Sequence, residues 1–455
     1  MTPDPTTLIN LFFAALTLCL PLGLMLLLAS SLPEKDAPDG AVTLLLSWAT
    51  ALLAYFAVGF AFQFGGIAQV TPHPDLHGLY WEWYPVPDSM SLEQARAWGM
   101  IALQGWFLTG SANTPGALQL FLSHSALVGL ATMLPVAGLI HRQIMAGDDT
   151  VSSPKTPNRL AYIIMALFIG SIFYPIPGNW LWGGGWLSQL GVSLNFGQGM
   201  VDFGGASLIF LTGSLITLTG LFSYPVSPQL FPSDASDASD EVEPLSPPMP
   251  SAYLPILSLL GAGLMLMGWF GLSVGVHTPT AVNISPAQVA VNGVLGAFST
   301  MLMVALYSWF TTTQLNPLMV GRGFVAGLVL TMAGAPFLSP WTVLLSGLLL
   351  GLLLPPTIYL FEHRLMLTDT SGVIATFGLS SLLGLLLIPL LANGQAGQGW
   401  NSLDLSATSP AVTGLLAGGV WLGQLQAQLL GIVAIGLSII LLSVLLWQVI
   451  AKIWV

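Results

Sequence analysis

Two ionisable side chains lie in long apolar stretches of this sequence, where they could take part in chemistry. Asp202 opens one stretch, in the segment NFGQGMVDFGGAS, and His124 lies within another. An ionisable group in such a position is energetically costly and is therefore a candidate for function. The Asp202 carboxylate could attract a cation or cap a helix. His124 could line a binding site or bond a neighbouring carbonyl group.

Most other kinds of site are excluded by composition and motifs. Cys19 is the only cysteine, which excludes an internal disulfide and a cysteine-based zinc or iron–sulfur site. No Walker loop, dinucleotide fingerprint or hydrolase elbow occurs in a suitable context. His73, Asp75 and His77 alternate in TPHPDLHG and could hold a metal, but a proline-rich turn with solvated side chains is the preferred interpretation. We expect no enzymatic activity, no cofactor, no metal and no nucleic-acid partner.

The elements that must position Asp202 and His124 are membrane-spanning helices. Of the 455 residues, 54% are hydrophobic and only 6% are charged, with a mean hydropathy of +0.82, whereas a soluble domain carries about 25% charged residues. A helix crosses the bilayer with about 20 apolar residues. We predict an all-α polytopic membrane protein with about eleven spans, at residues 8–32, 41–64, 116–140, 159–179, 202–222, 252–275, 287–310, 322–338, 340–361, 371–392 and 414–451.

The positions of Lys and Arg set the expected orientation, because these residues are enriched in cytoplasmic loops. With eleven spans and an outside N-terminus, seven of the eight basic residues fall in inner loops and only Arg96 lies outside. We therefore expect a cell-membrane protein with its N-terminus outside and its C-terminus in the cytoplasm. The inner residues are Lys35, Arg142, Lys155, Arg159, Arg322, Arg364 and Lys452.

A single membrane domain is expected over residues 1–455, divided by an inner segment rich in Ser, Pro and acidic residues. Residues 223–251 have the composition of a disordered linker and separate a first half, about 1–222, from a second half, about 252–455. Five spans precede this linker and six follow it. The outer segment 71–113 contains the aromatic run GLYWEWYPVP, and we expect it to pack on the outer membrane face.

Several short segments form an ordered series along the chain. They are LPLGLMLLLASSLPEKDAP, AYFAVGFAFQFG, GNWLWGGGWLSQLG, MVDFGGAS, GWFGLSVG, NPLMVGRGFVAGLV and TDTSGVIATFGLSSLLG. In this order and spacing the sequence resembles the ammonium transporters of the Amt/Rh family over nearly its whole length. The resemblance implies a homotrimer in the lipid bilayer, with a central pore in each subunit. It also implies two five-helix halves of opposite topology, an inverted repeat of the kind that transporters use, plus an eleventh helix.

Some site residues of that family are retained. Trp182 matches the outer-vestibule tryptophan, which can stack on an ammonium ion by cation–π attraction; a tryptophan of the membrane interface is the alternative. Asp202 matches the fifth-span aspartate, which helps to bind the cation electrostatically. His124 falls close to a pore-entrance position that is commonly glutamine, where it would line the vestibule or bond a carbonyl group.

Other site residues of the family are replaced by residues without a polar side chain. Phe210 and Phe377 occupy the places of the paired pore histidines, which offer nitrogen partners to ammonia or a path for its proton. The remaining replacements are Leu127 and Leu272 for the two aromatic gate residues, Val276 for the vestibule serine, and Gly372 for the tenth-span aspartate.

These replacements predict an impaired central pore, because a desolvated cation without polar partners costs several kcal/mol or more and a phenyl ring cannot relay a proton. Three functions stay open. The first is ammonium or ammonia transport, as the resemblance implies. The second is a non-conducting relative that acts as a membrane scaffold, sensor or complex subunit, and the third is a channel for another small neutral solute. Since the sequence ends directly after its last span, we also expect no regulation by a PII-type protein through the family's cytoplasmic tail.

Overall fold

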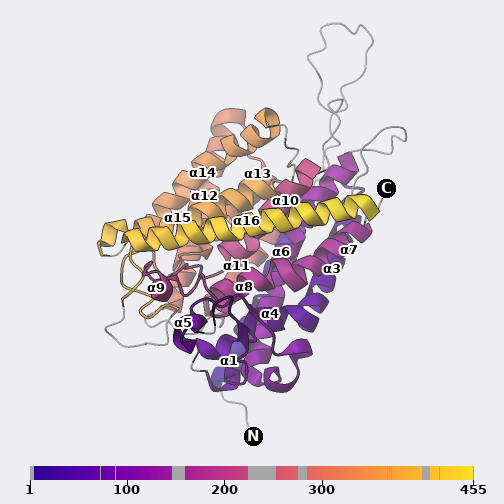
Figure 1. The fold of residues 1–455 in the computed structure, drawn as a ribbon. Helices are drawn as coiled ribbons and strands as arrows, with labels where there is room; N and C mark the ends of the chain where they lie inside the picture. The colour runs from indigo at the N-terminus through magenta and orange to yellow at the C-terminus, as the bar shows by residue number, and fades with distance from the viewer. Residues whose placement is uncertain are drawn as a thin grey trace, which may run out of the picture.

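The computed structural model is almost wholly helical (Figure 1). It describes residues 5–71, 73–87, 89–145, 159–223, 253–274, 284–365, 367, 369, 371–401, 410–419 and 421–453. Within these residues, 10 helical segments are long and apolar enough to cross a membrane, and Pro317–Met332 is a shorter apolar helix. The prediction of an all-α polytopic protein with about eleven spans is therefore confirmed.

The spans of the first half are helices that wider π-helical turns interrupt or open. The helices are α1 (Pro5–Leu16), α2 (Cys19–Ala29), α3 (Ala37–Ala54), α4 (Phe60–Phe64), α6 (Pro115–Met145), α7 (Arg159–Phe168), α8 (Pro175–Trp182) and α10 (Thr212–Ser223). The π-helical turns are η1 (Tyr55–Gly59), η6 (Ile169–Phe173) and η7 (Ala206–Leu211).

The second half has the same construction. Its helices are α11 (Tyr253–Val274), α12 (Pro286–Thr312), α13 (Pro317–Met332), α14 (Pro340–Tyr359), α15 (Ser380–Leu391) and α16 (Trp421–Ile453), and its π-helical turns are η9 (Leu360–Arg364) and η10 (Ile374–Leu379). Three of these helices begin with proline, whose missing N–H costs nothing in the first helical turn. Ser285 and Asn316 cap two of them with their side chains.

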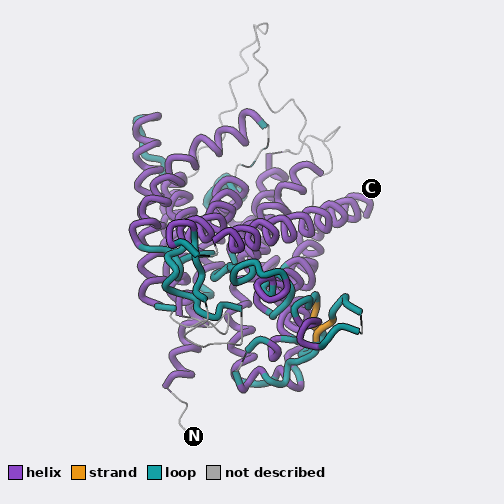
Figure 2. Tube along the Cα trace, turned by 60° about the vertical axis from the view of Figure 1, so that its left-hand side comes forward, coloured by secondary structure: helices purple, strands orange, loops and turns teal. Residues whose placement is uncertain are grey.

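The segment between α4 and α6 is folded from short elements and contains both named strands of the described chain. It comprises η2 (Ile67–Gln69), η3 (Pro74–Leu76), β1 (Glu82–Trp83), α5 (Leu92–Arg96), β2 (Ile101–Ala102), η4 (Trp106–Leu108) and η5 (Gly110–Ala112). The two strands pair antiparallel, with Glu82 opposite Ala102, and form a small hairpin at one edge of the bundle (Figure 2). Two other short elements are α9 (Leu190–Ser193) and η11 (Leu415–Ala417).

The packing of the helices in the second half parallels that in the first. α3 packs against α6 and α7, and α12 packs against α13 and α14. The two halves meet where α2 lies against α11 and where η7 lies against η10. α16 runs across the bundle against α10 and α15 (Figure 1). Its 33 residues are about 50 Å long, more than the roughly 30 Å of the hydrocarbon core, so this helix must tilt or extend beyond the core.

Several predicted boundaries are wrong by a few residues. The eighth span was expected at 322–338 with Arg322 in an inner loop, but α13 begins at Pro317 and buries Arg322, which is 6% exposed. The split from the next span is correct, since α14 begins at Pro340. The last span begins at Trp421 rather than near residue 414. The linker lies outside the described residues except for Ser223, and so does Val276.

Candidate functional site

Asp202 lies four residues before Ala206, the first residue of η7, and caps this turn with its side chain. Its Oδ1 accepts hydrogen bonds from the backbone N–H groups of Gly205 (3.0 Å) and Ala206 (2.8 Å). Its Oδ2 accepts from the backbone N–H (2.8 Å) and the hydroxyl (2.6 Å) of Ser207. These amides belong to the first turn, where helices lack internal acceptors. The carboxylate is 1% exposed, so its four bonds replace water.

Asp369 caps η10 in a closely similar way, although the sequence analysis did not single it out. Its Oδ1 accepts from the backbone N–H of Val373 (2.9 Å) and the hydroxyl of Ser371 (3.2 Å), and its Oδ2 accepts from the N–H of Ile374 (2.7 Å). Burial raises the pKa of this carboxyl from 3.8 to about 6, although the backbone donors and the charge of Arg322 lower it.

The two caps belong to a repeated pattern of residues. A glycine follows each aspartate by three residues and a phenylalanine by eight, in DFGGASLIF (202–210) and DTSGVIATF (369–377). Gly205 has a φ of +84° and Gly372 a φ of +70°, a backbone region that favours glycine. The glycine at 372 therefore suits the backbone there, and the aspartate that caps η10 is three residues earlier.

Phe210, in η7, and Phe377, in η10, face each other. Their ring centroids are 5.7 Å apart and their planes differ by 7°, which is a stacked arrangement within the usual range for aromatic pairs. Phe210 is 0% exposed and Phe377 is 1% exposed. A water-wide passage along either ring would leave part of that ring exposed, so this conformation has none there.

Trp182, His124 and Asp202 form one cluster beside η7. The indole Nε1 of Trp182 donates to the backbone carbonyl of Asp202 (2.9 Å), and the His124 ring packs edge-on to the indole at 5.2 Å. Trp182 is 3% exposed. A cation–π site needs a free ring face, so in this conformation the indole is covered rather than open to solvent.

A buried chain of polar side chains continues from His124. The His124 Nδ1 lies 2.8 Å from the hydroxyl of Tyr174 and 3.5 Å from Nε2 of Gln63. The Tyr55 hydroxyl donates to Oε1 of Gln63 (2.8 Å). All four residues are 0% exposed. Hydrogen bonds thus connect His124 to side chains of the neighbouring helices.

The two leucines predicted at the gate positions are both buried. Leu272 is 1% exposed, and its Cδ2 lies 3.1 Å from where a Cβ on Gly204 would be, so it contacts the chain between Asp202 and η7. Leu127 is 0% exposed and follows His124 by three residues on α6, on the same helix face. The described residues contain no group of three or more His, Cys, Asp or Glu side chains that could hold a metal.

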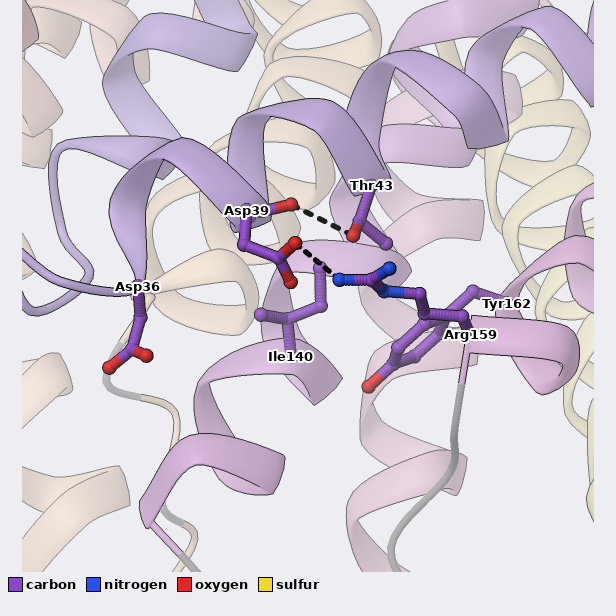
Figure 3. A pocket seen from close by; sticks show the side chains of 7 residues that line it. Asp36, Asp39, Thr43, Ile140, Arg159 and Tyr162 are labelled. Carbon is purple, nitrogen blue, oxygen red and sulfur yellow. Dashed lines mark hydrogen bonds and ion pairs between the residues drawn. The ribbon is translucent and has the colours of Figure 1, made fainter.

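A separate pocket of about 250 Å³ lies at the start of α3 (Figure 3). The guanidinium of Arg159 is paired there with the carboxylate of Asp39, and the Thr43 hydroxyl donates to the Asp39 carbonyl (2.9 Å). Both partners of the ion pair are more than half exposed, so it adds little stability. This pocket shares no lining residue with the Phe210–Phe377 pair.

The long apolar helices define a multi-pass α-helical membrane protein. The sequence model of the Ammonium Transporter Family matches residues 157–455. The chain belongs to this family.

Individual relatives agree with this assignment. The chain is 26% identical to ammonium transporter Amt2 of Archaeoglobus fulgidus over 399 residues, covering 87% of this chain and 72% of that protein. It is 28% identical to ammonium transporter Amt1 of Methanocaldococcus jannaschii over 239 residues, covering 52% of this chain and 55% of that protein.

Solved structures share the fold. The protein described as Sensor Amt Protein superposes with a TM-score of 0.69 at 20% identity, covering 98% of this chain and 93% of the other. Mep2 of Candida albicans superposes with a TM-score of 0.68 at 16% identity, covering 97% and 83%.

Proposed function

We propose that this member of the ammonium transporter family does not conduct the ammonium ion through its centre and acts in the membrane as a sensor or scaffold. The stacked pair Phe210–Phe377 carries this proposal. An ammonium ion passing between the rings would lose its water and find no hydrogen-bond acceptor, which costs several kcal/mol or more. Neither ring can accept a proton, so passage as neutral ammonia with separate proton transfer is not available either.

The space around the rings supports the same proposal. Neither ring leaves room for a water molecule beside it, and two stacked rings must separate before a solute of that size can pass. The separation would also expose apolar surface in a tightly packed region. The proposed barrier is therefore both steric and electrostatic.

Sensing requires that an ion be recognised without being passed on. Trp182 and Asp202 supply an aromatic ring and a carboxylate in one buried cluster. One protein of the same fold is described as Sensor Amt Protein. Ammonium binding that rearranges this cluster is the simplest form of the proposed sensor.

Ammonium or ammonia transport is the second candidate function. It is favoured by the retained Trp182 and Asp202 and by relatives named ammonium transporters. It requires the two phenylalanines to move apart during each passage. A channel for another small neutral solute would need the same movement, but it would tolerate the apolar lining.

The test uses the full chain in liposomes, with ammonium applied outside while current and internal pH are recorded. The wild type is compared with Phe210→His plus Phe377→His, and with Phe210→Ala plus Phe377→Ala as a matched control. We expect no current and no specific pH change from the wild type. The histidine pair provides space and nitrogen partners, whereas the alanine pair provides space alone and should pass only neutral ammonia.

A saturable wild-type response that persists at low protein density would refute the proposal and support transport. Wild-type flux of an uncharged solute without any ammonium response would support the channel function instead. Sensor and scaffold are separated by tryptophan fluorescence, since ammonium should change the emission of the wild type but not of Asp202→Asn if the protein is a sensor.

The arrangement of the chain in the membrane is also proposed. Homotrimerisation follows from the family resemblance, and native mass spectrometry should give three subunits. An outside N-terminus follows from the basic residues. The inverted five-plus-five repeat is supported by the parallel packing of α3 and α12 and by the repeated Asp-Gly-Phe pattern. Labelling of single cysteines from each side of the membrane tests the orientation.

A further inference from the structure

The outer hairpin buries a carboxyl group that the central site does not use. Glu82 on β1 is 8% exposed, whereas its neighbours Trp81 and Trp83 are 43% and 50% exposed. Successive side chains of a strand point to opposite faces. The glutamate is therefore turned toward the helices while the two tryptophans face outward.

The carboxyl group fits a socket that depends on two glycines. A Cβ on Gly99 would collide with Oε1 of Glu82, and a Cβ on Gly66 would lie 3.0 Å from its Oε2. Gly66 follows α4, and Gly99 precedes β2. The hairpin and the end of α4 thus close around one acidic side chain.

Two acceptor oxygens in this socket have no donor. Oε1 of Glu82 and Oδ1 of Asn179, on α8, are both buried without a hydrogen-bond partner in the described structure. The carboxyl group is within hydrogen-bonding reach of the Asn179 side chain. Nδ2 of Asn179 donates to the backbone carbonyl of Gln63 (3.3 Å), which leaves Oδ1 available.

Among the described residues, Tyr84 and Arg96 of α5 lie near this socket. Burial raises the pKa of Tyr84, the bond that its hydroxyl donates to Oε1 of Gln69 (2.6 Å) lowers it, and the charge of Glu82 raises it while that of Arg96 lowers it. Asn179 is the polar group that faces the carboxyl from α8. Burial raises the pKa of Glu82 from 4.5 to about 8, and the nearby Asn179 side chain lowers it only in part.

We propose that Glu82 is a proton-binding site on the outer side of the protein, whose neutral carboxyl O–H donates to Oδ1 of Asn179 and fastens the outer hairpin to α8. One proton then satisfies both oxygens that lack a donor. Loss of this proton to the outer solution leaves a buried carboxylate opposite a carbonyl oxygen, and both are acceptors. The unpaired charge is costly, so the hairpin is expected to loosen.

The contact between the hairpin and α8, which would loosen, lies close in sequence to Trp182. The indole Nε1 of Trp180 donates to the carbonyl of Met100 (2.9 Å), and the backbone N–H of Trp186 donates to the carbonyl of Gly99 (2.9 Å). These bonds join the chain directly before β2 to α8, which ends at Trp182, and to the segment that follows α8. Protonation of Glu82 would therefore control how firmly the outer hairpin is held beside the Trp182 cluster. This inference does not depend on whether the central path conducts.

The test follows the carboxyl group and the hairpin separately as the pH is raised, in full-length protein in nanodiscs. Infrared difference spectra should show a protonated carboxyl C=O band that disappears with a midpoint near pH 8. Hydrogen exchange of the β1 and β2 amides, corrected for its intrinsic pH dependence, should accelerate over the same range. Glu82→Gln keeps a donor for Asn179, so it should lack the band and keep a protected hairpin at every pH.

The control is Asp75→Asn, which changes a carboxyl group of the same outer segment and should retain both transitions. Asn179→Leu removes the acceptor and should move the infrared band and reduce hairpin protection below pH 8. A carboxyl band with an ordinary glutamate midpoint, or one that persists in Glu82→Gln, would overturn the proposal. Hairpin protection that does not change with pH in the wild type would do the same.

Discussion

An aspartate caps each of the π-helical turns η7 and η10, but the two carboxylates have different electrostatic surroundings. Asp202 accepts four hydrogen bonds, and no ion pair to it occurs among the described residues. Asp369 accepts three, and the charge of Arg322 acts on it. The guanidinium Cζ of Arg322 lies 2.9 Å from where a Cβ on Gly372 would be.

The same capping arrangement therefore occurs with two different sets of neighbouring charges. Hydrogen bonds from the first helical turn stabilise either carboxylate locally. Only the carboxylate at η10 also has a buried cation nearby, so only the one at η7 keeps an uncompensated negative charge that could attract a cation. The charge near the two carboxylates differs because of one residue on another helix, Arg322 on α13, and not because of residues in η7 or η10.

Removal of that cation should have the largest effect on stability. Arg322→Met leaves Asp369 and Glu362, whose charges both act on Arg322, without compensation in a buried region. Loss of one partner from a buried charge cluster costs about 3–5 kcal/mol. Denaturant unfolding should show this loss, and Arg322→Lys, which keeps the charge, should lose less. Equal stability of Arg322→Met and wild type would mean that the cation is unimportant to the cap.

Gln428 of α16 connects the chain before η7 with α15, and its loss should have the next largest effect. Its Oε1 accepts from the N–H of Val201 (2.9 Å), and its Nε2 donates to the carbonyls of Val201 (2.8 Å) and Leu385 (3.3 Å). The Leu385 carbonyl is free for this bond because Pro389, four residues later in α15, has no N–H.

Gln428→Leu should therefore lower the unfolding free energy by about 2–3 kcal/mol, since buried backbone groups lose their partners. Gln424→Leu is the matched control. Gln424 bonds only the N–H of Gln198 (3.1 Å) and the carbonyl of Gly199 (2.9 Å), on the η7 side. If both variants lost the same stability, the link to α15 would contribute nothing.

Alanine at either positive-φ glycine should cost less, about 1–3 kcal/mol. Gly205→Ala would also press against the Trp182 ring, at 2.8 Å, and Gly372→Ala against Arg322. Measured side by side, the two losses should be similar, because the backbone is the shared part of the comparison. A loss at only one position would show that the two turns are not equivalent.

A further expected effect is a pH dependence at the η10 cap. Its carboxyl group has a pKa of about 6 against an ordinary value of 3.8. The folded state therefore holds the proton more tightly, and this contribution to stability is present below pH 3.8 and lost as the pH rises through 6. In Arg322→Met the pKa of Asp369 should rise further, so the loss should extend to higher pH. Unfolding curves at a series of pH values will show whether the window moves.

The spans were predictable from the sequence because hydropathy alone determines which segments can cross a bilayer. Arg322 was misplaced for the same reason. A hydropathy argument assigns a charged residue to a loop, whereas here the charges of Asp369 and Glu362, distant in sequence, compensate its burial. These charges come close to Arg322 only in the folded chain, so the sequence alone does not reveal them.

Asp369 was missed because it lies before its apolar stretch and because the resemblance directed attention to Gly372. The equal spacing of Asp, Gly and Phe in 202–210 and 369–377 was a signal available in the sequence. The stacking of Phe210 on Phe377 could not be derived, since it depends on how η7 and η10 meet.

The π-helical turns that contain Phe210 and Phe377 have a consequence for helical phase. A π turn holds more residues than an α turn, and each residue of an α-helix advances its side chain by about 100°. Conversion of η7 or η10 to α-helix would therefore rotate the phenylalanine relative to the capped end of its own helix while the aspartate stayed in place. A change of one residue in the number that each turn holds would therefore change the direction in which the phenylalanine side chain points.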